Sequence, residues 1–159
     1  MPEPLDEPMA TESNEDMQSS QSEDGAGADG NVSFVMDGDF TGEWKNHGSL
    51  ETFVTSNVLM ASVYLDGKDK PQNVLTLAIR NTEPGTTIDL GKEMYGINIM
   101  MTDYNLNPKS GTLTVTDSDA DWVIGTVNGA TLSGKSYSDP KGGEKSVTLN
   151  DFSFKIKKK

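Results

Sequence analysis

Short runs of alternating apolar and polar residues, separated by turn-forming residues, extend from about residue 31 to the end of the chain. The clearest run lies near the C-terminus, where Phe152, Phe154 and Ile156 alternate with polar residues. Alternation with a period of two is typical of a strand that buries one face and exposes the other. The pattern predicts an all-β domain, an antiparallel β-sandwich or a small lipocalin-like β-barrel.

Turn signals divide this region into the expected strands. Asp37-Gly38, Asp66-Gly67 and Pro84-Gly85 are typical turn pairs. We expect strands at residues 32–36, 40–44, 51–56, 57–65, 73–80, 86–90, 95–103, 111–116, 122–127 with a continuation at 130–136, and 145–157. The stretch NLNPKSG, residues 105–111, is expected to be a turn. The phase of the last strand changes between Leu149 and Phe152, which predicts a bulge at Asn150 or Asp151.

The first 30 residues have a different composition. They contain nine of the 25 acidic residues and no basic residue, and Ser, Gln, Gly, Ala, Pro and Met supply most of the remainder. Such a segment cannot bury enough apolar surface to offset the entropy lost on ordering. We therefore expect a disordered acidic tether at residues 1–30 and a β domain at 31–159. The tether is either a solvating spacer or an interaction tail, and the lack of periodic apolar anchors favours the spacer.

Charge and composition exclude several classes of function. The net charge of −12 argues against nucleic-acid binding as a general surface property, although residues 31–159 carry only −3. The absence of cysteine excludes disulfides and thiol catalysis. The single histidine, His47, cannot form a multi-histidine metal site and is expected in an exposed loop. No apolar run reaches the roughly 18 residues of a membrane-spanning helix.

Three aspartates alternate in the stretch TDSDADW: Asp117, Asp119 and Asp121. Their spacing matches the first ligand positions of a calcium-binding EF-hand loop. The glycine and glutamate that such a loop needs further along are replaced by Trp122 and Asn128. A hairpin loop between two alternating strands explains the stretch better. A weak calcium site of another type at the three aspartates remains the alternative.

Two further features suggest chemistry. GATLSGKS, residues 129–136, formally matches a phosphate-binding loop, but Pro140 and two glycines follow where a helix is needed, so we interpret the match as chance. Arg80, the only arginine, ends an apolar strand. It could bind the carboxylate of a ligand, but pairing with a neighbouring carboxylate of the sheet is the favoured interpretation.

Aromatic residues and methionines are the remaining candidates for a binding site. They could line a cavity for a ligand, or they could fill the core and close the ends of a small barrel. The candidate ligand-binding residues are Trp44, Tyr64, Tyr95, Met100 and Trp122.

Parts of the second half resemble a group of small, uncharacterised β-sheet lipoproteins of Bacteroidetes and related bacteria, described as lipocalin-like. The similar stretches are PGTTIDL (84–90), SGTLTVTDSDADWVIGTVNGATL (110–132) and KSVTLNDFSFKIK (145–157). The resemblance implies a lipid-anchored precursor, with residues 1–30 as the tether and the anchor removed. It therefore implies a cell-envelope or secreted location, and a cytoplasmic protein is the alternative. The chain departs from the group's pattern at Asn150-Asp151 and in its long acidic tail.

The sequence therefore predicts a monomeric, non-enzymatic binding module of the cell envelope without a cofactor. Its expected ligand is a small apolar molecule, a glycan or a partner protein, with no nucleic acid and no membrane contact beyond the removed anchor. The alternative is a structural or adhesive module that acts through its loops or sheet edges.

Overall fold

The computed structural model describes residues 29–92, 96–139 and 141–158, and these residues form ten β-strands and no helix. The first five strands are β1 (Gly30–Gly38), β2 (Gly42–His47), β3 (Leu50–Thr55), β4 (Val58–Tyr64) and β5 (Val74–Ile79). The last five are β6 (Thr87–Asp89), β7 (Ile97–Met100), β8 (Asn105–Ser118), β9 (Trp122–Gly134) and β10 (Lys145–Lys157).

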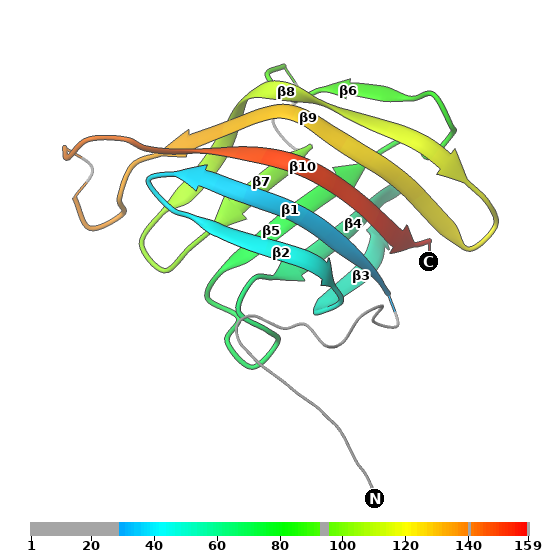
Figure 1. The fold of residues 1–159 in the computed structure, drawn as a ribbon, viewed down its shortest axis with the longest axis horizontal. Coiled ribbons are helices and arrows are strands. Elements are labelled where there is room, and N and C mark those ends of the chain that lie inside the picture. Colours follow the sequence, from blue (N-terminus) through cyan, green and yellow to red (C-terminus); the bar gives the residue numbers. More distant parts are fainter. Residues whose placement is uncertain (1–28, 93–95, 140, 159) are drawn as a thin grey trace, which may run out of the picture.

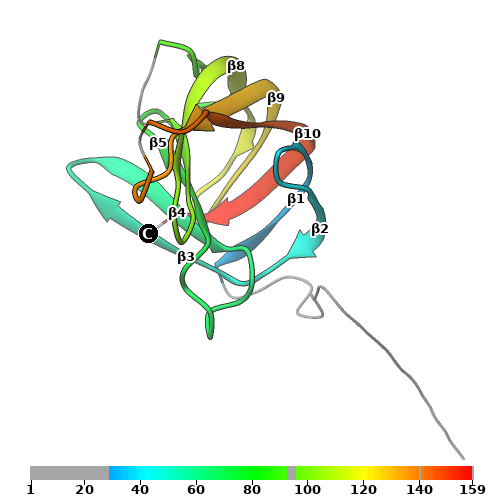
Figure 2. The ribbon, with the colours of Figure 1, turned by 90° about the vertical axis from the view of Figure 1, so that its left-hand side faces the viewer.

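Nine strands follow one another in the order β2-β1-β10-β9-β8-β7-β5-β4-β3, and the short β6 pairs with β8 beside this path. Every described pairing is antiparallel. The sheet is strongly curled, with β8, β9, β10 and β1 on one side and β5, β4 and β3 on the other (Figure 1, Figure 2). The domain is thus a half-barrel, which confirms the predicted all-β antiparallel class.

The strand β8 joins the two sides of the half-barrel. It pairs with β7 through Asn105 and Leu106, and with β9 along most of its remaining length. The prediction of a turn at residues 105–111 was therefore wrong, because this stretch is the first half of β8. Pro108, which donates no backbone hydrogen bond, lies where neither β7 nor β6 pairs with β8. A proline is tolerated at such a local edge.

Aligned irregularities bend the neighbouring strands β8, β9 and β10. The predicted bulge in β10 is confirmed: Asn150 and Asp151 are both exposed between buried Leu149 and Phe152, and Asp151 has a φ of 52°. The adjacent strand β9 has the same pair of exposed residues at Asn128-Gly129. Because an extra residue increases local twist and bends a strand, these bulges contribute to the curl of the sheet.

Apolar side chains from both sides of the half-barrel meet in one core cluster, whose members are at most 6% exposed. The ring of Phe34, a member of this cluster, stacks on Trp44, with ring centroids 4.7 Å apart, and on Phe152, with centroids 4.9 Å apart. Offset aromatic pairs of this kind add to the stabilisation that burial provides.

Side-chain hydrogen bonds connect β2, at one end of the strand path, with the end of β4 on the other side of the half-barrel. Trp44 donates from Nε1 to the Leu65 carbonyl oxygen at 2.9 Å, and His47 Nε2 lies 2.6 Å from the Tyr64 carbonyl oxygen. His47 is only 6% exposed, so its prediction as an exposed loop residue was wrong. The polar sequence around it gave no sign that the end of β2 folds against β4.

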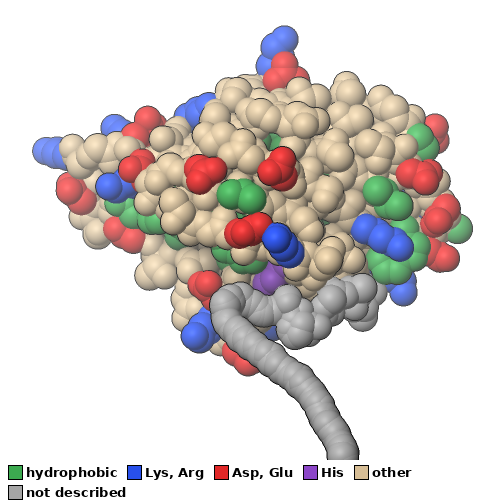
Figure 3. All heavy atoms as spheres, in the orientation of Figure 1, with side chains coloured by type: hydrophobic (Ala, Val, Ile, Leu, Met, Phe, Trp, Pro, Cys, Tyr) green, Lys and Arg blue, Asp and Glu red, His purple; other side chains and the backbone are tan. Residues whose placement is uncertain are grey.

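The predicted boundary between tether and domain lies close to the start of the described fold. Residues 1–28 of the predicted tether lie outside the described residues, whereas Asp29 accepts a hydrogen bond from the Thr52 backbone N–H at 2.9 Å. On the face seen in Figure 3, acidic and basic side chains are scattered among uncharged residues. No helix of the described part is long and apolar enough to cross a membrane.

Candidate functional site

The larger of two neighbouring hollows is a groove on the outer face of β4, β5, β7 and the start of β8. It has a volume of about 570 Å³, within the range of small-molecule sites. The antiparallel pairing of β4, β5 and β7 explains which residues line it, because it places outward-facing residues of neighbouring strands next to one another. Met60 pairs with Ala78, and Thr76 pairs with Asn98. The groove is lined by Thr55, Ser56, Val58, Met60, Thr76, Ala78, Arg80, Asn98, Asn105 and Asn107.

Three asparagines form one wall of this groove. Asn98 Nδ2 donates to Asn105 Oδ1 at 2.6 Å, to Asn107 Oδ1 at 3.1 Å and to the Leu106 carbonyl oxygen at 3.0 Å. These bonds fix the orientation of all three amides. The Nδ2 groups of Asn105 and Asn107 and the Oδ1 atom of Asn98 make no hydrogen bond to a described residue. Two amide donors and one acceptor are therefore free for a ligand.

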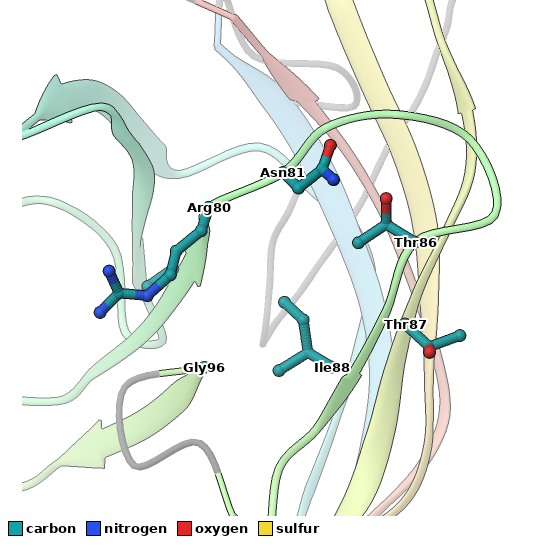
Figure 4. A pocket seen from close by; sticks show the side chains of 7 residues that line it. Arg80, Asn81, Thr86, Thr87, Ile88 and Gly96 are labelled. Carbon is teal, nitrogen blue, oxygen red and sulfur yellow. The ribbon is translucent and has the colours of Figure 1, made fainter.

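Arg80 lies at the end of the groove and contributes to both hollows. The second hollow, of about 190 Å³, is lined by Ala78, Arg80, Asn81, Thr86, Thr87, Ile88 and Gly96. The guanidinium of Arg80 extends away from Asn81, Thr86 and Ile88 (Figure 4). Within the described part of the chain, Arg80 makes no hydrogen bond and no ion pair. The favoured interpretation, a pairing with a neighbouring carboxylate, therefore does not hold among the described residues.

The charge of the two hollows is opposite to that of the chain. The net charge of the whole chain is −12, yet the residues that line the two hollows include one arginine and no acidic residue. The remaining lining residues carry uncharged amides, hydroxyls or apolar side chains, apart from Gly96. Described groups with a shifted pKa, such as Tyr64, Asp103 and Asp119, are absent from both linings. This surface offers amide and hydroxyl groups and one cation to a polar molecule.

The four predicted ligand-binding residues that the structure describes do not form one site. Trp44 packs against the core, and the Trp122 ring lies under the Lys155 ammonium, 4.8 Å from the ring centroid. Tyr64 and Met100 flank Val74 on the face that carries the groove, but neither lines it. Tyr95 lies outside the described residues. Ligand binding at these five positions stays a prediction.

The three aspartates lie at the hairpin turn between β8 and β9, which confirms the hairpin interpretation. Asp119 Oδ1 accepts hydrogen bonds from the backbone N–H groups of Asp121 and Trp122, at 2.8 and 2.9 Å. Asp117 accepts from the next residue, Ser118, at 2.8 Å. No group of three or more potential metal ligands occurs in the described ranges. The carboxylate of Asp119 thus stabilises a turn, and a weak calcium site has no geometric support.

Replacing Asp119 with an uncharged residue should destabilise the fold at pH values where the Asp119 carboxylate of the unchanged protein is ionised. The backbone N–H groups of Asp121 and Trp122 lower the pKa of Asp119 below its ordinary value of 3.8, with a smaller contribution from Lys158. A group whose pKa is lower in the folded state than in the unfolded state stabilises the fold at pH values above its unfolded-state pKa. This stabilisation is lost as the pH falls through the folded-state pKa. We therefore expect Asp119→Asn to lower the free energy of unfolding at pH 7, with a difference that shrinks as pH falls below 3.8.

Urea unfolding of both proteins over this pH range measures the effect. Asp121→Asn is the matched control, because the Asp121 carboxylate accepts no hydrogen bond from a described residue. A deficit of Asp119→Asn that is the same at neutral and acidic pH would contradict the expectation.

The phosphate-loop match also has a structural explanation. Its residues Gly129–Gly134 belong to β9, and no helix follows among the described residues, which confirms the interpretation as chance. The last residue of the match, Ser136, is buried and donates a hydrogen bond to Asp103, which also accepts from Ser138. The bond from Ser136 and those from Ser138 lower the pKa of Asp103. This cluster joins two loops and includes no histidine that could act as a base.

Sequence reasoning missed the asparagine wall. Asn98 lies in a predicted strand, and Asn105 and Asn107 were assigned to a turn because asparagine disfavours strands. The signal available in the sequence was the alternation of Asn105 and Asn107 around Leu106, which has the period of a strand. Polar residues that disfavour a strand but occupy one face of it point to a role other than stability.

Comparison with known proteins identified no relative. No family model matches the chain, no curated protein matches it, and no solved structure matches it.

Proposed function

We propose that this protein is a non-enzymatic binding module that binds a glycan in the groove on the outer face of β4, β5, β7 and β8. We further propose that it is the soluble part of a secreted or lipid-anchored bacterial cell-envelope protein. Support for the location comes from the acidic composition of residues 1–30 and from the resemblance to small β-sheet lipoproteins. In this proposal the ligand lies in the groove and not in a cavity lined by aromatic residues.

The observation that carries the proposal is the free hydrogen-bonding capacity of the asparagine wall. Sugar hydroxyls both donate and accept hydrogen bonds, and their ring carbons present small apolar patches. The groove offers the Nδ2 groups of Asn105 and Asn107 as donors and the Oδ1 atom of Asn98 as an acceptor. Val58 and Met60 supply apolar surface beside them. Because Asn98 holds its neighbours in place, little side-chain entropy remains to be lost on binding.

Binding to an array of neutral and acidic oligosaccharides tests this proposal. We expect selective binding to a subset of glycans, and we expect Asn107→Ala to weaken it about tenfold, because one or two hydrogen bonds to the ligand are lost. Asn128→Ala is the matched control, since Asn128 is an exposed asparagine at the β9 bulge and is absent from the groove lining.

Two results would contradict the proposal: no binding above background, or equal binding by both variants and the unchanged protein.

One feature favours the second candidate, a structural or adhesive module. The strand β3 ends the path of nine strands, and its Phe53 and Val54 are 45% and 47% exposed. Exposed apolar edge strands can add strands from other chains. Concentration-dependent association in sedimentation velocity, without glycan binding, would favour this second function.

A further inference from the structure

We propose that the glycan bound in this groove carries a carboxylate, as a uronic acid residue does, and that Arg80 binds this carboxylate. The inference rests on the proposed function and names the class of glycan that the groove selects. In this arrangement the guanidinium of Arg80 would hold the carboxylate at one end of the groove, while Asn98, Asn105 and Asn107 would bind hydroxyl groups further along it.

The first argument is the contrast between the charge of the groove and that of the chain. Arg80 is the only arginine among 159 residues, and it lines a hollow without any acidic lining residue in a chain of net charge −12. An arginine that serves only solubility or fold stability commonly pairs with a surface carboxylate, and 16 such groups follow residue 30. Within the described ranges Arg80 pairs with none of them.

Two described acidic residues on elements close to Arg80, Glu83 and Glu51, make no ion pair with it. Glu83 follows in the loop after β5, whereas the Arg80 side chain extends away from that loop (Figure 4). Glu51 pairs across the sheet with Ser62, and Ser62 pairs with Thr76. Thr76 precedes Arg80 by four residues. At about 3.3 Å per residue, the backbone positions are roughly 13 Å apart along the strand. Glu51 already accepts a hydrogen bond from the Tyr64 hydroxyl at 2.8 Å.

The second argument is the match between the guanidinium and a planar carboxylate. Arginine presents parallel N–H donors that bind both oxygens of a carboxylate, and such bonds are stronger than those between neutral groups. The register of β4 and β5 ends at the Leu59–Ile79 pair, and Val58 and Arg80 are the next residues beyond it. Both line the groove, as do the three asparagines. Charged and neutral recognition groups are therefore separated along one groove, as in a sugar chain that has acidic and hydroxyl groups on successive units.

The single arginine makes a direct test possible. In the ¹⁵N-labelled full chain it gives one arginine Nε–Hε signal, which needs no assignment. The probes are glucuronate, galacturonate, glucose, galactose, acetate, sulfate and a short glutamate peptide, at equal ionic strength and mildly acidic pH. We expect saturable shifts of the Arg80 signal and of asparagine side-chain signals with at least one uronate. Glucose and galactose should leave the Arg80 signal unchanged.

Calorimetry with tetragalacturonate then measures the contribution of Arg80. We expect Arg80→Gln to weaken binding about tenfold or more, and Arg80→Lys to weaken it less, because lysine keeps the charge but loses the paired donors. Lys68→Gln is the matched control, because it changes the net charge equally at an exposed position outside the groove lining.

The outcomes separate this inference from the proposed function. If neutral sugars shift the asparagine side-chain NMR signals as strongly as uronates do, the carboxylate inference is overturned and glycan binding stays in place. No effect of any sugar on Arg80 or the asparagines would overturn both. Equal responses to acetate, sulfate and uronates would show a general anion site, and a response to the glutamate peptide alone would show a peptide site. Either of these last two results would overturn the inference.

Discussion

Replacing Phe34 with alanine should lower the free energy of unfolding by about 3–5 kcal/mol, the usual cost of removing a fully buried phenylalanine. Phe34 is 1% exposed, and its ring lies between Trp44 and Phe152 in the aromatic stack. The truncation removes both ring contacts and leaves a cavity among side chains from β1, β2 and β10. Since domains of this size are commonly stable by about 5–15 kcal/mol, the variant should unfold at a much lower urea concentration.

Phe53→Ala is the control for this experiment. Phe53 lies in β3 and is 45% exposed, so its truncation should cost less than about 1 kcal/mol. Urea unfolding followed by tryptophan fluorescence measures both variants, because Trp44 stacks on Phe34. A similar loss of stability in the two variants would contradict the assignment of the aromatic stack to the core.

Replacing Gly111 with alanine should cost about 2–4 kcal/mol, from backbone strain and steric overlap together. Gly111 has a φ of 120°, a conformation that residues with a side chain rarely adopt. A Cβ atom there would lie 2.6 Å from the Ala130 Cα atom and 2.9 Å from the Ala130 nitrogen, both of them backbone atoms of β9. Relief of this overlap requires β8 and β9 to separate where the sheet bends.

The variant Gly129→Ala separates the two contributions to this loss of stability, steric overlap and backbone strain. Gly129 also has a positive φ, of 66°, but a Cβ atom there would meet no atom within 4 Å. We expect a cost of about 1 kcal/mol, the penalty of the left-handed conformation alone. Thermal unfolding by circular dichroism compares the two variants. An equal cost would show that the contact between Gly111 and β9 does not restrict the fold.

The strands with regular alternation were predictable, and those that depend on distant partners were not. In β10 the buried side, with Phe152, Phe154 and Ile156, follows from local spacing. The first half of β8 was missed because Asn105, Asn107 and Pro108 disfavour a strand when judged by themselves. Pairing with β9 at Asn107 and Pro108 outweighs that local preference. His47 was misjudged for the same reason, since the partner at its Nε2 atom belongs to β4.

The candidate site also depends on contacts between distant segments, which the sequence could not predict. The sequence singled out Arg80 and considered a carboxylate as its partner, but it offered aromatic residues as the lining of a cavity. In the structure Trp44 is part of the core packing, and three asparagines form a wall of the groove. Strand alternation could indicate that Asn105 and Asn107 share a face, but not which strand lies beside them.

By itself, the sequence determined the all-β class, the concentration of acidic residues before residue 30 and the inward side of the last strand. These properties depend on composition and on the period of two, which are local. The tertiary structure alone decided the order of the strands, the burial of His47 and the position of the groove. Asn98, Asn105, Asn107 and Arg80 come together through ladders that join β5, β7 and β8, and such pairing depends on which distant segments meet.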